Sequence, residues 1–311
     1  MITVVGESLV DLIEEAAGGA TAYPGGSPAN VAVALARLGQ PTTLLSQLGD
    51  DAYGRLVRAH LAGSGVRLDP ASVSDLPHTS VARTRVGADG QARYDFAIDW
   101  PAFPAGTLTG VGAGSDCLHT GSLATVLDPG AGDVVALVHD RRATTTISFD
   151  PNCRPSLTGD RVRARHRVED LVAVSDLVKV SREDLDWLHP GQPPDRVARR
   201  WLELGAGLVV VTLGAEGALA VTRQVAWRVT ARPVTVVDTV GAGDAFTAGL
   251  LAALQEHRLL GADRRAALRA AGPETLATVL DNAARVAALT CARRGADPPT
   301  RAELAALPAP A

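Results

Sequence analysis

The chain has 311 residues, of which 46% are hydrophobic and 21% charged, a composition typical of a globular protein with an ample core. Its formal net charge of −4 gives no reason to expect a nucleic-acid partner, and no apolar run is long enough to span a membrane. The first residues, MITVVGES, indicate a strand and not a targeting signal. Three cysteines without a CxxC pair favour a reducing, cytoplasmic location.

Apolar runs that stop at polar or glycine-rich corners recur along the chain. We expect strands at 2–5, 9–13, 42–48, 116–120, 145–149, 177–180, 208–211 and 234–237, with helical segments between most of them. This pattern predicts an α/β fold, a doubly wound, mostly parallel sheet flanked by helices, in a single domain over 1–311. In such sheets ligands bind beyond the carboxyl ends of the strands, so the polar corners predict a site there.

Two stretches near the N-terminus contain polar candidates. Asp11 lies inside an apolar strand, where a carboxylate is either solvated at an edge or used by a site. In GGSPANVAVALARLG at 25–39, Ser27 is the expected N-cap of a helix that Gly39 ends. Asn30 lies in the first turn beside Gly25-Gly26, where it can bind a hydroxylated ligand or simply be an ordinary helix-start residue.

Residues 79–98 alternate with a period of two around Asp89-Gly90, which predicts an antiparallel hairpin with Arg83, Arg85 and Arg93 on one face. Inserted between βα units, this hairpin is expected to be a small lid or a dimer contact. Residues 12–23 are expected to take part, so the lid comprises about 12–23 and 79–100. A second hairpin is predicted at 217–229, and a long amphipathic helix at 274–294 contains Asn282.

The most informative stretch is VTVVDTVGAGDAFTAGLLAAL at 234–254, which predicts a strand, a glycine turn and a helix. Unpaired N–H groups and the helix dipole suit an anion at such a turn, and glycine lets the backbone approach it closely. Asp244 in the first helical turn either caps the helix or acts as a base beside a bound phosphate. From the residues alone these two interpretations are equally plausible.

Two common phosphate motifs are absent. A Walker-type loop needs a lysine directly after its glycines, and the only lysine of the chain, Lys179, lies in the strand-like segment LVKVS. The GxGxxG dinucleotide fingerprint also fails, because Phe246 stands where its third glycine belongs. This failure argues against a dehydrogenase, and it means that any nucleotide is bound by another route.

Several motifs together resemble those of the ribokinase-like (PfkB) carbohydrate kinases over essentially the whole chain. They are DTVGAGDAFTAGLL at 238–251, GGSPANVAVALARLG at 25–39, DPNCRP at 150–155 and VTLGAEGA at 211–218. GESLVDL at 6–12, DPNCRP and KVSRED at 179–184 are most similar to the fructokinases. The resemblance implies a ribokinase-like fold with a small β-sheet lid, and ATP-dependent phosphorylation of a hydroxymethyl group, with fructose to fructose 6-phosphate as the leading reaction.

The resemblance also implies roles for single residues. Asp244 would be the catalytic base, and the backbone of Gly241-Ala242-Gly243 would form the anion hole for the transferred phosphoryl group. The residues expected to bind the sugar are Asp11, Gly25, Gly26, Asn30, Asn152 and Arg154. Those expected to bind ATP are Ser181, Thr212, Gly214 and Gly217, with Asn282 near the adenine. Mg²⁺ would accompany ATP, and a potassium-type ion, common in the family, would lie on backbone oxygens near Asp238 and Val240.

The chain departs from the family pattern at two places. The Asn-x-x-Glu motif associated with magnesium is replaced by Ser181 and Asp184, which leaves open whether Asp184 contributes to a metal site. The second threonine of the usual DTTGAGD is Val240, a change that matters little where only the backbone carbonyl is used.

Other functions stay open at this point. The substrate can instead be 2-keto-3-deoxygluconate, with Arg154 facing its carboxylate, or ribose or a nucleoside. A non-catalytic sugar-binding regulator is an alternative of a different class. A sugar and ATP are the expected small-molecule partners, and the lid is the expected contact of a homodimer.

Overall fold

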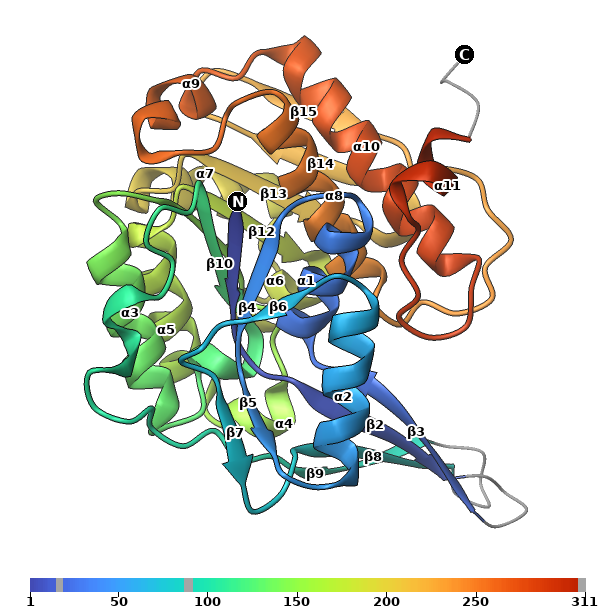
Figure 1. Cartoon of the computed structure of the whole chain (residues 1–311). Coiled ribbons are helices and arrows are strands. Elements are labelled where there is room, and N and C mark those ends of the chain that lie inside the picture. The colour runs from blue at the N-terminus through green and yellow to red at the C-terminus, as the bar shows by residue number, and fades with distance from the viewer. Residues whose placement is uncertain (15–18, 87–91, 307–311) are drawn as a thin grey trace.

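The computed structural model describes residues 1–14, 19–86 and 92–306. A nine-stranded sheet runs through the molecule in the order β15-β14-β13-β12-β11-β10-β1-β4-β6 (Figure 1). Its central strands are β1 (Ile2–Val5), β4 (Thr42–Leu45), β10 (Cys117–Gly121), β11 (Thr146–Asp150), β12 (Leu177–Ser181) and β13 (Leu208–Thr212). These strands and the short edge strand β6 (Arg67–Leu68) are parallel, whereas β14 (Ala218–Val221) and β15 (Ala226–Val229) form the antiparallel edge.

Both faces of the sheet are buried, which explains why its strands are nearly continuous apolar runs. Alternate residues of one strand enter different cores: Leu208 and Val210 pack on one face, and Val209 and Val211 on the other. The hydrophobic runs therefore predicted the strands well, because parallel strands covered on both sides need apolar residues at every position.

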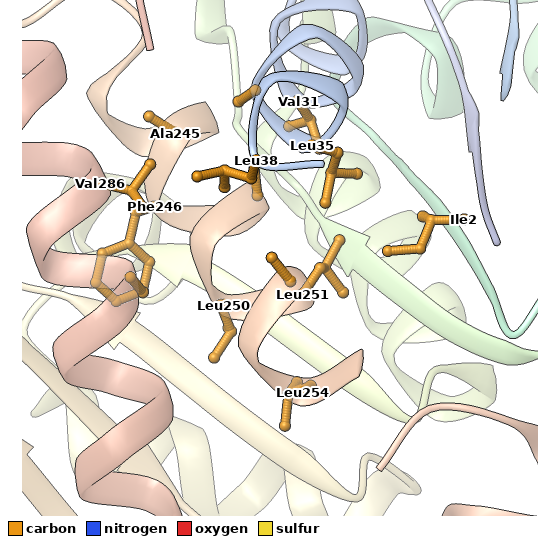
Figure 2. Close-up of a cluster of buried hydrophobic side chains, with 14 of the residues drawn as sticks. Ile2, Val31, Leu35, Leu38, Ala245, Phe246, Leu250, Leu251, Leu254 and Val286 are labelled. Carbon is orange, nitrogen blue, oxygen red and sulfur yellow. The ribbon is translucent and has the colours of Figure 1, made fainter. Parts of the chain in front are cut away.

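Helices cover the two faces. The face with α1 (Ser27–Arg37), α8 (Ala242–Glu256) and α10 (Pro273–Cys291) contains the cluster in Figure 2, to which Leu35, Phe246 and Val286 belong. The opposite core is formed with α3 (Gly130–Arg141), α5 (Arg161–Val174), α6 (Arg182–Leu188) and α7 (Pro194–Leu204). The remaining helices are α2 (Ala52–Gly63), α4 (Pro155–Thr158), α9 (Arg265–Arg269) and α11 (Arg301–Ala305). Among the described residues, no helix has the length and apolar character to cross a membrane.

A separate four-stranded sheet extends beyond the carboxyl end of β1 (Figure 1). It contains β2 (Leu9–Glu14), β3 (Ala20–Gly25), β8 (Val81–Val86) and β9 (Ala92–Ala97), in the order β3-β2-β8-β9. We call this sheet the lid. The small second sheet expected from the sequence is confirmed, whereas its action as a lid stays a prediction. The Asp89-Gly90 turn and residues 15–18 lie outside the described part of the chain, as do the side chains of Arg85 and Arg93.

The predicted strand at 234–237 is wrong. These residues have no regular structure, and Val236 and Val237 are 59% and 60% exposed. The hairpin of β14 and β15 occupies the sheet edge beside β13, so no strand partner is left for this segment there. Instead, the backbone N–H of Val237 donates to the carbonyl of Cys291 at the end of α10, at 2.8 Å.

Two further predictions are corrected. Residues 42–48 form two strands, because β5 (Gln47–Gly49) leaves the large sheet after β4 and pairs with β7 (Val73–Leu76). Ser27 is not the N-cap of α1: Gly26 occupies that position, and the Ser27 hydroxyl donates instead to Asp244, 217 residues away in sequence. A tertiary contact that no local pattern reveals has replaced the local cap.

Candidate active site

A cavity of about 720 Å³ lies between the carboxyl ends of the strands and the lid. It gathers many residues expected from the sequence, namely Asp11, Gly26, Asn30, Asn152, Arg154, Val240, Gly241, Gly243 and Asp244. Its wall also contains Glu7, Ser27, Phe96, Ser122 and Lys179, to which the sequence analysis assigned no ligand role. Residues from β2, α1, β11–α4 and α8 thus meet in one place, as the crossover topology predicts.

Asp244 is the buried carboxylate at the centre of this wall. It is the third residue of α8, and its oxygens accept hydrogen bonds from Ser27 Oγ (2.7 Å) and Asn30 Nδ2 (2.9 Å). The N-cap of α8 is Gly241, with no side-chain cap, so the local capping role considered for Asp244 is not the one it has. Burial raises the pKa of the Asp244 carboxyl above its ordinary value, which suits a group that must take up a proton.

The turn before α8 has a backbone that a ligand can approach closely. Gly241 has a φ of 73°, and a Cβ there would lie 2.6 Å from the Cβ of Ala296, so only glycine fits. Asp238 fixes the turn by accepting hydrogen bonds from the backbone N–H groups of Val240 (3.1 Å) and Gly295 (2.8 Å). The N–H of Ala242 donates to the carbonyl of Thr239 (3.2 Å), but no side chain caps the N–H groups that follow it in the first turn of α8, so these are available to an anion.

The lid side of the cavity contains a second acid. Asp11 of β2 lies against Gly25, where a Cβ would approach Asp11 Oδ2 to 2.1 Å, so that glycine leaves room for the carboxylate. Burial and the neighbouring Asp244 raise the pKa of Asp11 to about 6. The structure places Asp11 in the site and not on a solvated strand edge.

Glu7 is a third acid of the wall and was missed as a site residue. Its Oε2 accepts a hydrogen bond from the backbone N–H of Ala124 (3.1 Å). The side chain of Ser122 forms a second hydrogen bond with the Glu7 carboxyl group. Burial raises its pKa to about 7. The sequence contained one signal, the adjacency of Glu7 to the strand end at Gly6, but its burial depends on the loop after β10.

Opposite these acids, the segment after β11 supplies a cation. Arg154 Nη1 donates to Asn152 Oδ1 at 2.8 Å, and the Arg154 side chain is exposed at the rim. Asn152 has a positive φ of 35°, a conformation that Asn tolerates better than most residues. The expected pair of substrate-binding residues therefore forms one connected unit at the cavity mouth.

The residues expected at the nucleotide lie farther along the sheet. Ser181 and Thr212 are register partners at the ends of β12 and β13, and Gly214 and Gly217 follow β13. None of the four lines the described cavity. Asn282 does not line it either, because its amide donates to the carbonyl of Gly249 at 2.8 Å and joins α10 to α8.

Among the described residues, no group of three or more His, Cys, Asp or Glu side chains is arranged to hold an ion. Asp184 Oδ1 accepts from the N–H of Cys153 (2.8 Å), and its Oδ2 and Ser181 form a capping box on α6. Hydrogen bonds within the protein therefore occupy both carboxylate oxygens of Asp184.

Comparison with known proteins finds the same family over nearly the whole chain. The pfkB family carbohydrate kinase model matches residues 1–303. The chain is 38% identical to a fructokinase of Rhizobium leguminosarum bv. trifolii over 84% of this chain and 81% of the relative. Among solved structures, a fructokinase from Xylella fastidiosa with bound ATP superposes with a TM-score of 0.85 at 27% identity, covering 98% of this chain and 97% of the other.

A second solved structure extends the likeness. A fructokinase from Vibrio cholerae O395 in a form with fructose, ADP and a calcium ion superposes with a TM-score of 0.80 at 28% identity, covering 98% of this chain and 97% of the other. The family match over nearly the whole chain confirms the resemblance drawn from the motifs. The protein described here belongs to the pfkB family of carbohydrate kinases.

Proposed function

We propose that this carbohydrate kinase transfers the γ-phosphoryl group of ATP to fructose and forms fructose 6-phosphate. The observation that carries the proposal is the buried Asp244 carboxylate at the uncapped start of α8, in the wall of a cavity of about 720 Å³. The fructokinase relatives and the solved fructokinases with fructose and ADP or with ATP support the choice of substrates.

In this proposal the sugar lies between Asp11, Asn30 and Arg154, and its 6-hydroxyl faces Asp244. Asp244 accepts the hydroxyl proton while the oxygen attacks phosphorus, and the N–H groups after Gly241 stabilise charge on the phosphoryl oxygens. Positioning and charge stabilisation supply most of the catalysis in phosphoryl transfer, and a positioned base adds about 10²–10⁴-fold. Ser27 and Asn30 hold the carboxylate until the substrate arrives.

Cations complete the proposed site. Asp184 would hold a Mg²⁺ ion that accompanies ATP through water ligands, since hydrogen bonds within the protein occupy both its oxygens, and the ion would supply positive charge to the phosphates. A potassium-type ion on backbone oxygens near Asp238 and Val240 would stabilise the same turn. Ser181, Thr212, Gly214 and Gly217 border the nucleotide, with Asn282 near the adenine.

One observation favours a second candidate substrate. Arg154 is an exposed cation at the cavity rim, and it would pair with the carboxylate of a keto acid such as 2-keto-3-deoxygluconate. Fructose offers no charge to this guanidinium, so substitution of Arg154 separates the candidates. Arg154→Gln should lower kcat/KM for a keto acid far more than for fructose.

The test is a substrate panel with Mg-ATP, ranked by kcat/KM. The panel contains fructose, ribose, 2-keto-3-deoxygluconate and a nucleoside, with ADP formation and sugar phosphate both measured. Fructose should rank first. A higher kcat/KM for another substrate replaces fructose in the proposal, and no turnover with any of them indicates a sugar-binding regulator.

Location and assembly belong to the proposal as well. The three cysteines are free, as a reducing cytoplasm would keep them. Ile13 and Tyr23 of the lid are large, exposed apolar side chains, which supports a homodimer formed through this sheet. Sedimentation of the protein and of Ile13→Glu would test the dimer, because the variant should shift it toward monomer.

A further inference from the structure

Lys179, the only lysine of the chain, lies in the wall of the catalytic cavity. It belongs to β12, its side chain is 5% exposed, and its Nζ lies 2.9 Å from Asp150 Oδ2 on β11. Asp150 is 3% exposed, so the ion pair is almost fully removed from water. The pair stands directly behind the glycine turn that opens α8.

Stability alone does not explain a buried pair at this position. Replacing such a pair by well-packed apolar residues is often neutral or stabilising, and the neighbours of Lys179, Val178 and Val180, are themselves buried valines. An ammonium group has three N–H donors, and the described residues offer this one a single acceptor, Asp150. Two donors are therefore left for a ligand.

The ammonium lies against the anion hole. A Cβ at position 243 would lie 3.1 Å from Lys179 Nζ, so the glycine at this position keeps the space between the ammonium and the first turn of α8 open. Thr247 Oγ1 lies 3.3 Å from Asp150 Oδ2 and 3.0 Å from the carbonyl oxygen of Gly243, which links the ion pair to that turn. Lys179, Gly243 and Asp244 thus border the same space.

The charge on Lys179 persists at neutral pH. Burial lowers its pKa, but the carboxylates of Asp150, Asp184 and Asp244 outweigh that effect and raise it above the ordinary value. An amine that stays protonated supplies positive charge and N–H donors, and it cannot act as a base. Together with Asp244, the site would then hold one group that takes a proton and one that keeps its own.

We propose that Lys179 is a catalytic residue whose ammonium binds the oxygens of the transferred phosphoryl group. This inference rests on the proposed kinase reaction. The sugar hydroxyl oxygen forms a bond to the γ-phosphorus, and the bond from that phosphorus to the bridging oxygen breaks, so that ADP leaves with the electron pair. The hydroxyl proton passes to Asp244, while Lys179 stays protonated and pairs with the phosphoryl oxygens.

The single lysine allows a test on the unmodified protein. Protein labelled with ¹³C at the lysine ε-carbon gives one lysine side-chain resonance, that of Lys179. The signal should move when aluminium fluoride is added to protein holding magnesium, ADP and fructose, because this complex places a phosphoryl mimic in the anion hole. If the chemical shift is the same before and after aluminium fluoride is added to the complex with magnesium, ADP and fructose, the inference is overturned.

Lys179→Met provides the kinetic test. The loss of one transition-state donor should lower kcat by about 10²–10³-fold with KM for fructose nearly unchanged. The affinity of the ADP–aluminium fluoride complex relative to ADP should fall by a similar factor. Arg167→Met, which removes a cation from an ion pair with Asp128 away from the cavity, should leave both values unchanged.

A purely structural Lys179 gives a different result: a lower melting temperature, with the ratio of the two affinities unaltered, and this outcome overturns the inference. If the methionine variant does not fold, the resonance of the unmodified protein decides. Both binding measurements are independent of turnover. Failure to phosphorylate fructose therefore overturns the proposed function and leaves the result for Lys179 to stand on its own.

Discussion

Two features of Asp244 have opposite effects on the pKa of its carboxyl group. Its carboxylate is buried, which disfavours its charge, and it accepts two side-chain hydrogen bonds, which favour it. Burial is the larger effect, and the pKa is raised. A base of this kind holds a proton more readily than a solvated aspartate does.

Replacing Asp244 by Asn should lower kcat about 10²–10⁴-fold, the usual contribution of a positioned base. Binding of fructose, measured by calorimetry, should change little, since the amide keeps the shape and an acceptor oxygen for Ser27. Asp263→Asn, at an exposed position on the surface, is the matched control and should retain full turnover. Near-normal kcat in the Asp244 variant would remove it from the mechanism.

Glu7 should make stability depend on pH. Its native pKa of about 7 exceeds the ordinary value of 4.5, so between these values the native state binds a proton that the unfolded state has lost. The stabilisation is complete below pH 4.5 and disappears as the pH rises through 7. Asp11 acts with the same sign between 3.8 and about 6.

In Glu7→Gln this dependence should disappear. Between pH 5 and pH 8 the free energy of unfolding of the unaltered protein should fall by up to about 3 kcal/mol more than that of the variant. Urea unfolding at a series of pH values measures the difference. Parallel curves for the two proteins would contradict the assignment of a shifted pKa to Glu7.

At the scale of elements, α8 connects the site to the core. Its residues from Asp244 to Leu254 are all buried, so the helix whose first turn would form the anion hole is also a central element of packing (Figure 2). Gly249 is the point of closest contact with α10, since a Cβ there would lie 2.9 Å from the Cα of Ala283. The Asn282 amide bonds the Gly249 carbonyl at the same contact.

Gly249→Ala should therefore destabilise the protein by about 1–3 kcal/mol, because the added methyl group forces the two helices apart. Gly132 in α3 is a matched control: it is exposed, and a Cβ there meets no atom within 4 Å. Gly132→Ala should stabilise by roughly 0.5–1 kcal/mol through its helix propensity. Thermal unfolding would show opposite signs for the two variants, and equal effects would contradict the contact argument.

At the scale of the whole molecule, the lid and the large sheet form the cavity together. Phe96 of β9 and Ala82 of β8 line the same cavity as Asp244, although neither strand belongs to the large sheet. We expect that this apolar cover excludes water from the reacting phosphoryl group and so limits transfer to water.

Phe96→Ala should raise the ratio of ATP hydrolysis to sugar phosphorylation several-fold. Asp95→Ala, next to it in the same strand, changes a side chain that is 69% exposed and should leave the ratio as it was. The two products, phosphate and sugar phosphate, are measured in the same reaction. An unchanged ratio in the Phe96 variant would count against a water-excluding lid.

How much the sequence predicts also depends on scale. Parallel strands buried on both faces have long apolar runs, and glycine turns have few alternatives, so the sheet strands, the hairpins and the turn at Gly241 were predictable from local patterns. The run at 234–237 has the same local pattern, yet it is exposed, and β14 takes the place beside β13 in the sheet. A local pattern does not tell which positions in a sheet are already filled by other strands.

The sequence by itself determined the α/β class, the lid and the motifs that connect the chain to its family, because these depend on residue spacing within short segments. Only the tertiary structure decided that Ser27 and Asn30 hold Asp244, that Glu7 is buried beside them, and that Lys179 stands behind Gly243. These contacts join residues far apart along the chain. Burial and charge pairing arise only when the crossovers bring those residues together, and they set the chemistry of the site.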